Sequence, residues 1–165
     1  MDRFKIYLSG GMTGLTLEDQ LQWRDQVCEM IIYSKHDRTC LPYFFNPPRY
    51  YSLENKKHKN EREVMEFDLN ALRKSDLVIV NFNDHQSLGT AMELMVAYER
   101  KIPVVGICSD TSLLHPWLIE CTNRMCSSID EAAKYVVDFY LNDPGYCNLV
   151  RSFGGCYDES NFFRY

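Results

Sequence analysis

Glu93 stands where a carboxylate could act as a nucleophile, in the segment Ser87–Leu94 (SLGTAMEL) that joins an expected strand to an expected helix. A carboxylate in the first turn of a helix is kept ionised by the partial positive charge of the helix start, and can then attack an electrophilic carbon. A structural interpretation competes with this one. Thr90-Ala91-Met92-Glu93 matches a capping box, in which the glutamate bonds back to the N–H of the cap residue. Taken alone, the segment favours the capping box.

Asp68, in EVMEFDLNAL, is the second candidate carboxylate. It lies either on an exposed helix face, where Arg62 or Arg73 could pair with it, or at the edge of a cleft. Apolar neighbours favour the cleft because they indicate that much of this helix is buried: Val64, Phe67, Leu69 and Leu72. The segment by itself leaves both interpretations open.

The remaining candidates lie at the ends of predicted strands. In an open parallel sheet, ligands bind outside the carboxyl ends of the strands, where loops lead into helices. Tyr7 lies near the end of the first strand, although its alternation with Ile6 and Leu8 is also typical of a core aromatic. The candidate substrate-binding residues include glycines, which let a ligand approach the backbone: Ser9, Gly10, Gly11, Met12, Asn81, Ser87 and Gly89.

The common motifs for dinucleotides, phosphates and metals do not occur in the sequence. The first loop reads SGGMTG rather than GxGxxG, and there is no GxxxxGK[ST] segment. The histidines and the seven cysteines lack the spacing of a metal site. We therefore expect neither a metal ion nor a cofactor.

Strand-like and helix-like segments alternate along the chain. The expected strands are Phe4–Ser9, Leu41–Phe45, Asp76–Phe82, Ile102–Cys108 and Arg124–Cys126. The expected helices are 16–33, 61–74, 88–100 and 129–141, and the stretch through His115-Pro116-Trp117 is expected to be irregular. This order, with short connections, predicts an α/β fold in which a central parallel sheet of about five strands carries helices on both faces.

Composition narrows the class of protein. With 165 residues, 45% of them apolar and 25% charged, the chain is typical of one globular domain. A net charge of −5 argues against binding to a nucleic-acid backbone, and no apolar run approaches the roughly 20 residues that span a bilayer. The missing secretory signal and the scattered cysteines predict reduced thiols and a cytoplasmic location. The domain is expected to cover residues 1–141, and the tail 142–165 to pack on it or on a neighbouring subunit.

Three segments, in the same order, resemble the nucleoside 2-deoxyribosyltransferase family: IYLSGGMTG, EFDLNALRKSDLVIVNF and SLGTAMELMVAYERKIPVVGI. The resemblance implies a flavodoxin-like three-layer sandwich, a homo-oligomer, and a small-molecule nucleoside or nucleotide as substrate. It also implies that Glu93 is the nucleophile, that Asp68 handles the proton of the nucleobase, and that Tyr7 positions the nucleophile. Such an enzyme cleaves an N-glycosidic bond through a glycosyl-glutamate ester and passes the sugar to another base.

Ser87 departs from the pattern of these transferases, which commonly carry an aspartate for the sugar 5′-hydroxyl at this place. Ser87-Leu88-Gly89 is similar to the related nucleoside 5′-monophosphate N-glycosidases, which hydrolyse their substrate. A serine at a helix start can bind the 5′-phosphate of such a substrate, whereas an aspartate would repel it. The loop SGGMTG lacks the arginine that those hydrolases place near the phosphate. Transfer is therefore favoured slightly over hydrolysis. A non-catalytic nucleotide-binding or sensing module is the third alternative.

Overall fold

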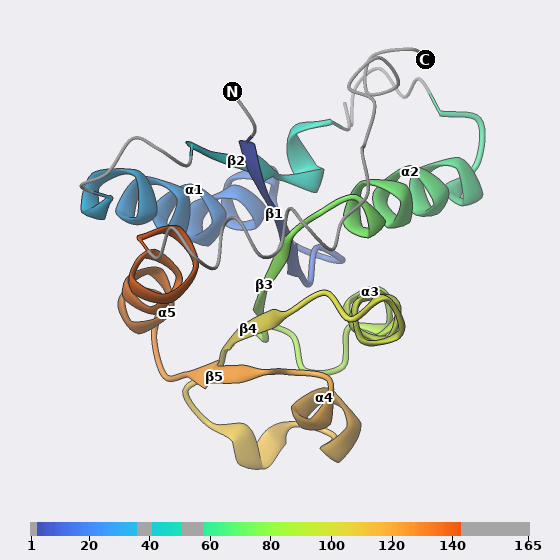
Figure 1. Cartoon of the computed structure of the whole chain (residues 1–165). Helices are drawn as coiled ribbons and strands as arrows, with labels where there is room; N and C mark the ends of the chain where they lie inside the picture. Colours follow the sequence, from blue (N-terminus) through green and yellow to red (C-terminus); the bar gives the residue numbers. More distant parts are fainter. Residues whose placement is uncertain (1–2, 36–40, 51–57, 143–165) are drawn as a thin grey trace.

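The computed structural model describes residues 3–35, 41–50 and 58–142, and it contains a sheet of five parallel strands. The strands lie in the order β2-β1-β3-β4-β5, which is the flavodoxin-like order (Figure 1). Their bounds are β1 (Arg3–Gly10), β2 (Leu41–Phe45), β3 (Leu77–Asn81), β4 (Val104–Ile107) and β5 (Arg124–Cys126). The predicted α/β fold with about five parallel strands is therefore confirmed.

Helices cover both faces of this sheet (Figure 1). The helix α1 (Leu17–Ser34) packs against α5 (Ile129–Tyr135) on one face, and α2 (Glu61–Arg73) packs against α3 (Leu88–Arg100) on the other. The last helix reaches Leu141, as predicted, but Val136–Leu141 is π-helical. In the described part of the chain, no helix is both long and apolar enough to pass through a membrane. The predicted packing of the tail falls on 143–165, outside the described residues.

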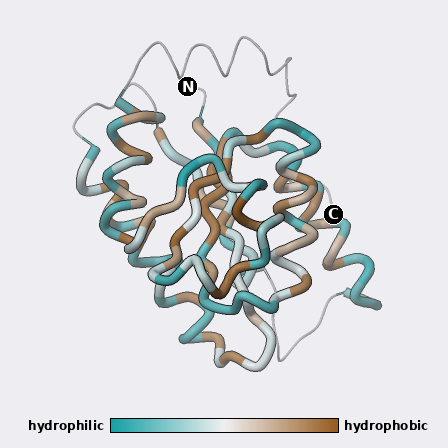
Figure 2. The backbone as a smooth tube through the Cα atoms, turned by 90° about the horizontal axis from the view of Figure 1, so that it is seen from below, coloured by the Kyte–Doolittle hydropathy of each residue, from teal (hydrophilic) through white to brown (hydrophobic). Residues whose placement is uncertain are grey.

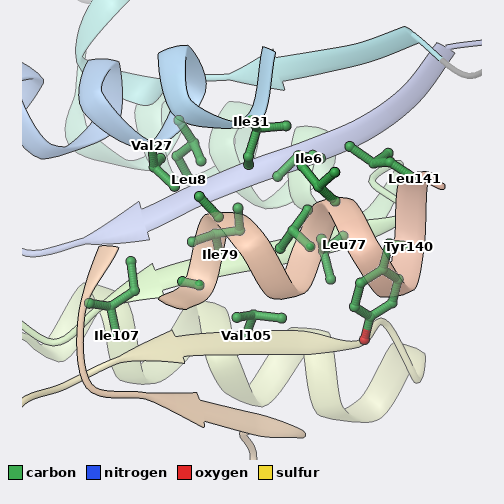
Figure 3. Close-up of a cluster of buried hydrophobic side chains, with 14 of the residues drawn as sticks. Ile6, Leu8, Val27, Ile31, Leu77, Ile79, Val105, Ile107, Tyr140 and Leu141 are labelled. Atoms are coloured by element: carbon green, nitrogen blue, oxygen red, sulfur yellow. The ribbon is translucent and has the colours of Figure 1, made fainter. Parts of the chain in front are cut away.

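Alternating side chains of the central strands supply the two halves of the core. Ile6 and Leu8 of β1 face α1 and α5, where they lie with Leu77 and Ile79 of β3 (Figure 3). Tyr7 of the same strand belongs to the opposite half, under α2 and α3. Figure 2 shows the apolar segments gathered toward the centre of the molecule. Because β3 is covered on both faces, its apolar run needs no polar alternation.

The start of α3 corrects one interpretation of the sequence. Ser87 is the N-cap residue, since its Oγ accepts a hydrogen bond from the N–H of Thr90 at 3.4 Å. Thr90 therefore lies inside the helix, and the predicted capping box Thr90–Glu93 does not form. Glu93 lies in the second turn rather than the first, where the field of the helix start has largely fallen away. Its carboxylate must be stabilised by other groups.

The stretch expected to be irregular contains a short helix, α4 (Pro116–Glu120). Pro116 occupies the first helical position, where a missing N–H costs nothing, and His115 Nδ1 accepts a hydrogen bond from the N–H of Trp117 at 3.3 Å. Five residues are too few for an apolar period to appear in the sequence. The expectation was wrong because local capping, rather than periodicity, forms this helix.

We predict that Gly10→Ala lowers the free energy of unfolding by about 1–3 kcal/mol, the usual cost of overfilling a packed site. A Cβ at this position would lie 2.9 Å from Cζ2 of the Trp23 ring and 3.1 Å from the backbone oxygen of Asn81. Gly89→Ala is the matched control, since its Cβ would meet nothing within 4 Å. Urea unfolding of the two variants checks the prediction, and equal midpoints would contradict it.

Candidate active site

The candidate residues gather at the carboxyl ends of β1 and β3, the two central strands. From here the chain leaves β1 toward α1 and β2 on one side, and leaves β3 toward α3 and β4 on the other. Such a topological switch point is where open α/β sheets bind ligands. Asn83 joins the two loops, because its Oδ1 accepts from Gly11 N at 3.1 Å and its Nδ2 donates to Gly11 O at 3.3 Å.

Two hydroxyls of β1 hold the Glu93 carboxylate. The Tyr7 hydroxyl donates to Oε1 at 2.7 Å, and the Ser9 hydroxyl donates to Oε2 at 2.5 Å. Tyr7 and Ser9 are two residues apart on the strand, so both side chains point to the face that α3 covers. Each carboxylate oxygen is thereby held by one hydroxyl. The sequence predicted all three residues as candidates, and the structure brings them into direct contact.

Tyr7 is a core aromatic, as one interpretation of its sequence pattern held, and its hydroxyl also contacts Glu93. Its ring is fully buried in the core and stacks on Phe45, with the ring centroids 5.4 Å apart. Only its hydroxyl reaches the carboxylate of Glu93. The packed ring limits where this hydroxyl can move, so a core aromatic also orients the Glu93 carboxylate.

Burial raises the pKa of Glu93, and the hydrogen bonds from Ser9 and Tyr7 and the charge of Arg24 oppose this effect. Removal of water from the carboxylate is the largest of these influences, so the net direction is upward. Burial thus favours the protonated form of Glu93, while its neighbours favour the ionised form. The Glu93 carboxylate is also more basic than an exposed one, because it is less stabilised by solvent.

Arg24 of α1 is the residue of the site that the sequence analysis missed. It is 0% exposed, and its guanidinium donates to the backbone oxygens of Leu8, Gly10 and Gln20. Desolvation lowers the pKa of Arg24 to about 10, against the charges of Glu93, Tyr7 and Asp68. One signal could have found it, since Arg24 falls at helical spacing from the buried Val27 and Ile31 and is therefore a charge on an apolar stripe.

Asp68 lies on the buried face of α2, together with Ala71 and Leu72. With 7% of its surface exposed, it does not lie on a solvated helix face, so that interpretation was wrong. The side chain of Arg62, one of its suggested partners, bonds instead to Glu66 at 2.8 Å. The Asp68 carboxylate acts electrostatically on Arg24, which places it in the same group of charges as Glu93.

The glycines among the candidates have two different environments. Gly10 and Gly11 are buried, and a Cβ on Gly11 would lie 2.7 Å from Cβ of Asp84, so they permit the two loops to approach closely. Gly89 is exposed and faces open space at the start of α3. Gly89 is therefore the glycine whose backbone a ligand can reach.

The last three candidates lie around these loops. Ser87 caps α3, and its Oγ also accepts a hydrogen bond from the Thr90 hydroxyl at 3.0 Å. Met12 is half-buried, and its carbonyl oxygen accepts from the Gln20 side chain at 3.1 Å. Asn81 is half-buried at the end of β3.

A cavity of about 410 Å³ adjoins the site at the carboxyl ends of β3, β4 and β5. Asn81 and Asn83 line its side nearest to β1, and Ser109, Asp110 and Ser127 line other parts. Neither Tyr7 nor Glu93 is among its lining residues, so the cavity lies beside the carboxylate rather than around it. Within the described ranges, no three His, Cys, Asp or Glu side chains gather as a metal site would require.

The fold and the site together define a flavodoxin-like α/β protein in which two strand hydroxyls hold a carboxylate at the switch point. A family model described as nucleoside 2-deoxyribosyltransferase matches residues 6–160. The chain belongs to this family, and it is thus an enzyme of the glycosyltransferase class that acts on nucleosides. Comparison with curated protein sequences gave no match.

Two solved structures share the fold. A conserved protein from Enterococcus faecalis V583 has a TM-score of 0.62 at 20% identity, over 83% of this chain and 99% of that one. A 2-deoxyribosyltransferase from Bacillus psychrosaccharolyticus has a TM-score of 0.63 at 16% identity, over 79% of this chain and 91% of that one. At these identities the likeness supports the architecture, and the arguments about individual residues rest on the geometry above.

We predict that Glu93→Gln raises the free energy of unfolding at neutral pH. The pKa of Glu93 is higher in the folded than in the unfolded state, so protonation of Glu93 stabilises the folded wild-type protein. This stabilisation is lost as the pH rises through the folded pKa. The amide does not titrate, so the advantage of the variant should shrink toward acidic pH.

Urea unfolding over a series of pH values measures this difference. Glu99→Gln, on the exposed face of the same helix, is the control and should show no such dependence. A Glu93→Gln variant that is less stable than the wild type at every pH would mean that this carboxylate mainly stabilises the fold.

Proposed function

We propose that this protein is a nucleoside 2-deoxyribosyltransferase-like enzyme that forms a covalent glycosyl ester on Glu93 and transfers the sugar to a second base. The observation that carries the proposal is the pair of hydroxyls, Tyr7 and Ser9, that hold both oxygens of the half-buried Glu93 carboxylate at the switch point. A nucleophile must be held in one orientation before it attacks, and this arrangement supplies that orientation.

In the first step an oxygen of Glu93 forms a bond to C1′ of the sugar while the bond from C1′ to the base nitrogen breaks. The transition state resembles an oxocarbenium ion, as in a retaining glycosidase. The electron pair of the broken bond leaves with the base, which takes a proton from Asp68. The position of Asp68 supports this role, since it is buried on the face of α2 and acts electrostatically on Arg24, as Glu93 does.

In the second step the nitrogen of another base attacks C1′, and the ester bond to Glu93 breaks. Asp68 accepts the proton that the incoming base loses, so both carboxylates return to their initial state. The homo-oligomer implied by the sequence stays a prediction.

Glu93→Gln should abolish base exchange, because the amide cannot form the ester. Tyr7→Phe should lower kcat about ten- to hundredfold, the equivalent of one hydrogen bond to a charged group, or about 1.5–3 kcal/mol. The assay offers a deoxynucleoside with a different free base and follows both bases by chromatography. Mass spectrometry of the wild type, quenched without the second base, should show the sugar bound to Glu93.

Glu99→Gln is the matched control for this experiment and should keep full activity, since Glu99 is exposed on the same helix. Exchange that survives Glu93→Gln would disprove the assignment of the nucleophile. Ligand-dependent stabilisation with no product formed would instead favour a binding or sensing module.

The start of α3 favours a second candidate, hydrolysis of nucleoside 5′-monophosphates. Ser87 and the exposed Gly89 begin a helix of 13 residues, whose first N–H groups can bind a phosphate. The Ser87 hydroxyl is engaged in capping, so backbone N–H groups would supply much of such a contact. Water would then replace the second base, and free sugar phosphate would be released.

Gly89→Ala tests this candidate, because the added methyl group would occupy open space at the helix start without disturbing the core. If a monophosphate is the substrate, its KM should rise while that of the unphosphorylated nucleoside stays unchanged. Equal KM values in the variant and the wild type for both substrates would exclude phosphate binding there. Base release from monophosphates without a second base distinguishes hydrolysis from transfer.

A further inference from the structure

The end of β1 lacks a neighbouring strand on one side. β2 pairs with β1 only as far as the register position Tyr7–Phe45, whereas β1 continues to Gly10. The carbonyl of Lys5 points toward β3, since it accepts a hydrogen bond from Asp76 N at 2.8 Å. Carbonyls alternate in direction along a strand, so those of Leu8 and Gly10 point to the β2 side, beyond the point where β2 has ended.

Arg24 supplies the hydrogen bonds that β2 does not make. Its Nε donates to Leu8 O at 3.4 Å and its NH2 group donates to Gly10 O at 2.9 Å, while its NH1 group bonds to Gln20 O of its own helix at 2.6 Å. The guanidinium also lies 4.5 Å from the centre of the Trp23 ring. Arg24 thereby connects α1 to the last residues of β1, where Tyr7 and Ser9 contact Glu93.

The backbone carbonyls that Arg24 binds are neutral, so they do not cancel its positive charge. The charged and titratable groups that act on it come from three elements: Tyr7 of β1, Asp68 of α2 and Glu93 of α3. Glu93 in turn is affected by Ser9 and Tyr7 of β1 and by Arg24 of α1. Glu93 lies beyond the first turn of α3, and among the described residues Arg24 is a cation whose charge favours its ionised form.

We propose that Arg24 is a positioning residue for the reaction proposed above, one that holds the end of β1 in place for Glu93 and whose charge favours the ionised form of the Glu93 carboxylate. The proposal rests on the proposed function for its catalytic consequence. Its electrostatic part concerns the unliganded protein and can be tested without any substrate.

The test is a ¹³C NMR titration of the Glu93 side-chain carboxyl in protein labelled at glutamate, with the signal assigned by its loss in Glu93→Gln. Arg24→Gln removes the charge, so the titration midpoint should move to higher pH than in the wild type. Arg24→Lys keeps the charge, so the midpoint should stay close to the wild-type value. Arg62→Gln is the control, because Arg62 is exposed and pairs with Glu66. A midpoint unchanged in Arg24→Gln would overturn the proposal.

Stability measurements keep the proposal testable where Arg24→Gln folds poorly. Glu93→Gln alone is expected to raise the free energy of unfolding, so the variants are compared in a double-variant cycle. The double variant Arg24→Gln/Glu93→Gln leaves neither an unpaired cation nor an unpaired anion, so Glu93→Gln should raise the free energy of unfolding more in the Arg24→Gln background than in the wild type. Equal increases in the two backgrounds would overturn the electrostatic coupling.

Measurements of base exchange distinguish the positioning role of Arg24 from its electrostatic role. Arg24→Lys cannot make the same three hydrogen bonds, so kcat of base exchange should fall at least tenfold with KM little changed. A fall in stability without a fall in kcat would overturn the positioning role. If the wild type shows no exchange at all while the NMR midpoint still moves in Arg24→Gln, the proposed function fails and the electrostatic role of Arg24 stands.

Discussion

The contact between Glu93 of α3 and the two hydroxyls of β1 is the interaction on which the site depends. It joins a helix to the strand beneath it, and it requires that α3 turn a charged residue toward a sheet whose side chains are mostly apolar. Leu94 and Ala97 of α3 are buried in the same half of the core, and their packing fixes the rotation of the helix that brings Glu93 to the strand. Packing and chemistry are consequently linked within this helix.

Burial of this carboxylate opposes stability, and the arrangement around it reduces the cost. Removal from water disfavours ionised Glu93, while the two hydroxyls and Arg24 favour it. Arg24 has a second use, because the same guanidinium bonds to the strand carbonyls that β2 leaves without partners. A buried charge usually destabilises a core, but the Arg24 guanidinium binds the end of β1 and favours the ionised form of the Glu93 carboxylate. Active sites commonly retain such local costs where they serve catalysis.

Much of the fold could be predicted from the sequence because its signals are local. The apolar run of β3 and the polar residues that begin each helix lie within a few residues of the structure they produce. The helix α4 was missed for the opposite reason, since its five residues carry no period. The candidates Tyr7, Ser9 and Glu93 could be named in advance, because strand ends and helix starts are recognisable and because the chain resembles a known family.

By itself, the sequence determined the order of strands and helices and the edge of the sheet at which chemistry could occur. Only the tertiary structure decided that Glu93 binds two hydroxyls rather than capping its helix, that Asp68 is buried, and that Arg24 belongs to the site. These three facts depend on how α1, α2 and α3 rotate and pack against β1. Such contacts join residues up to 86 positions apart, and no local pattern encodes a distance of that kind.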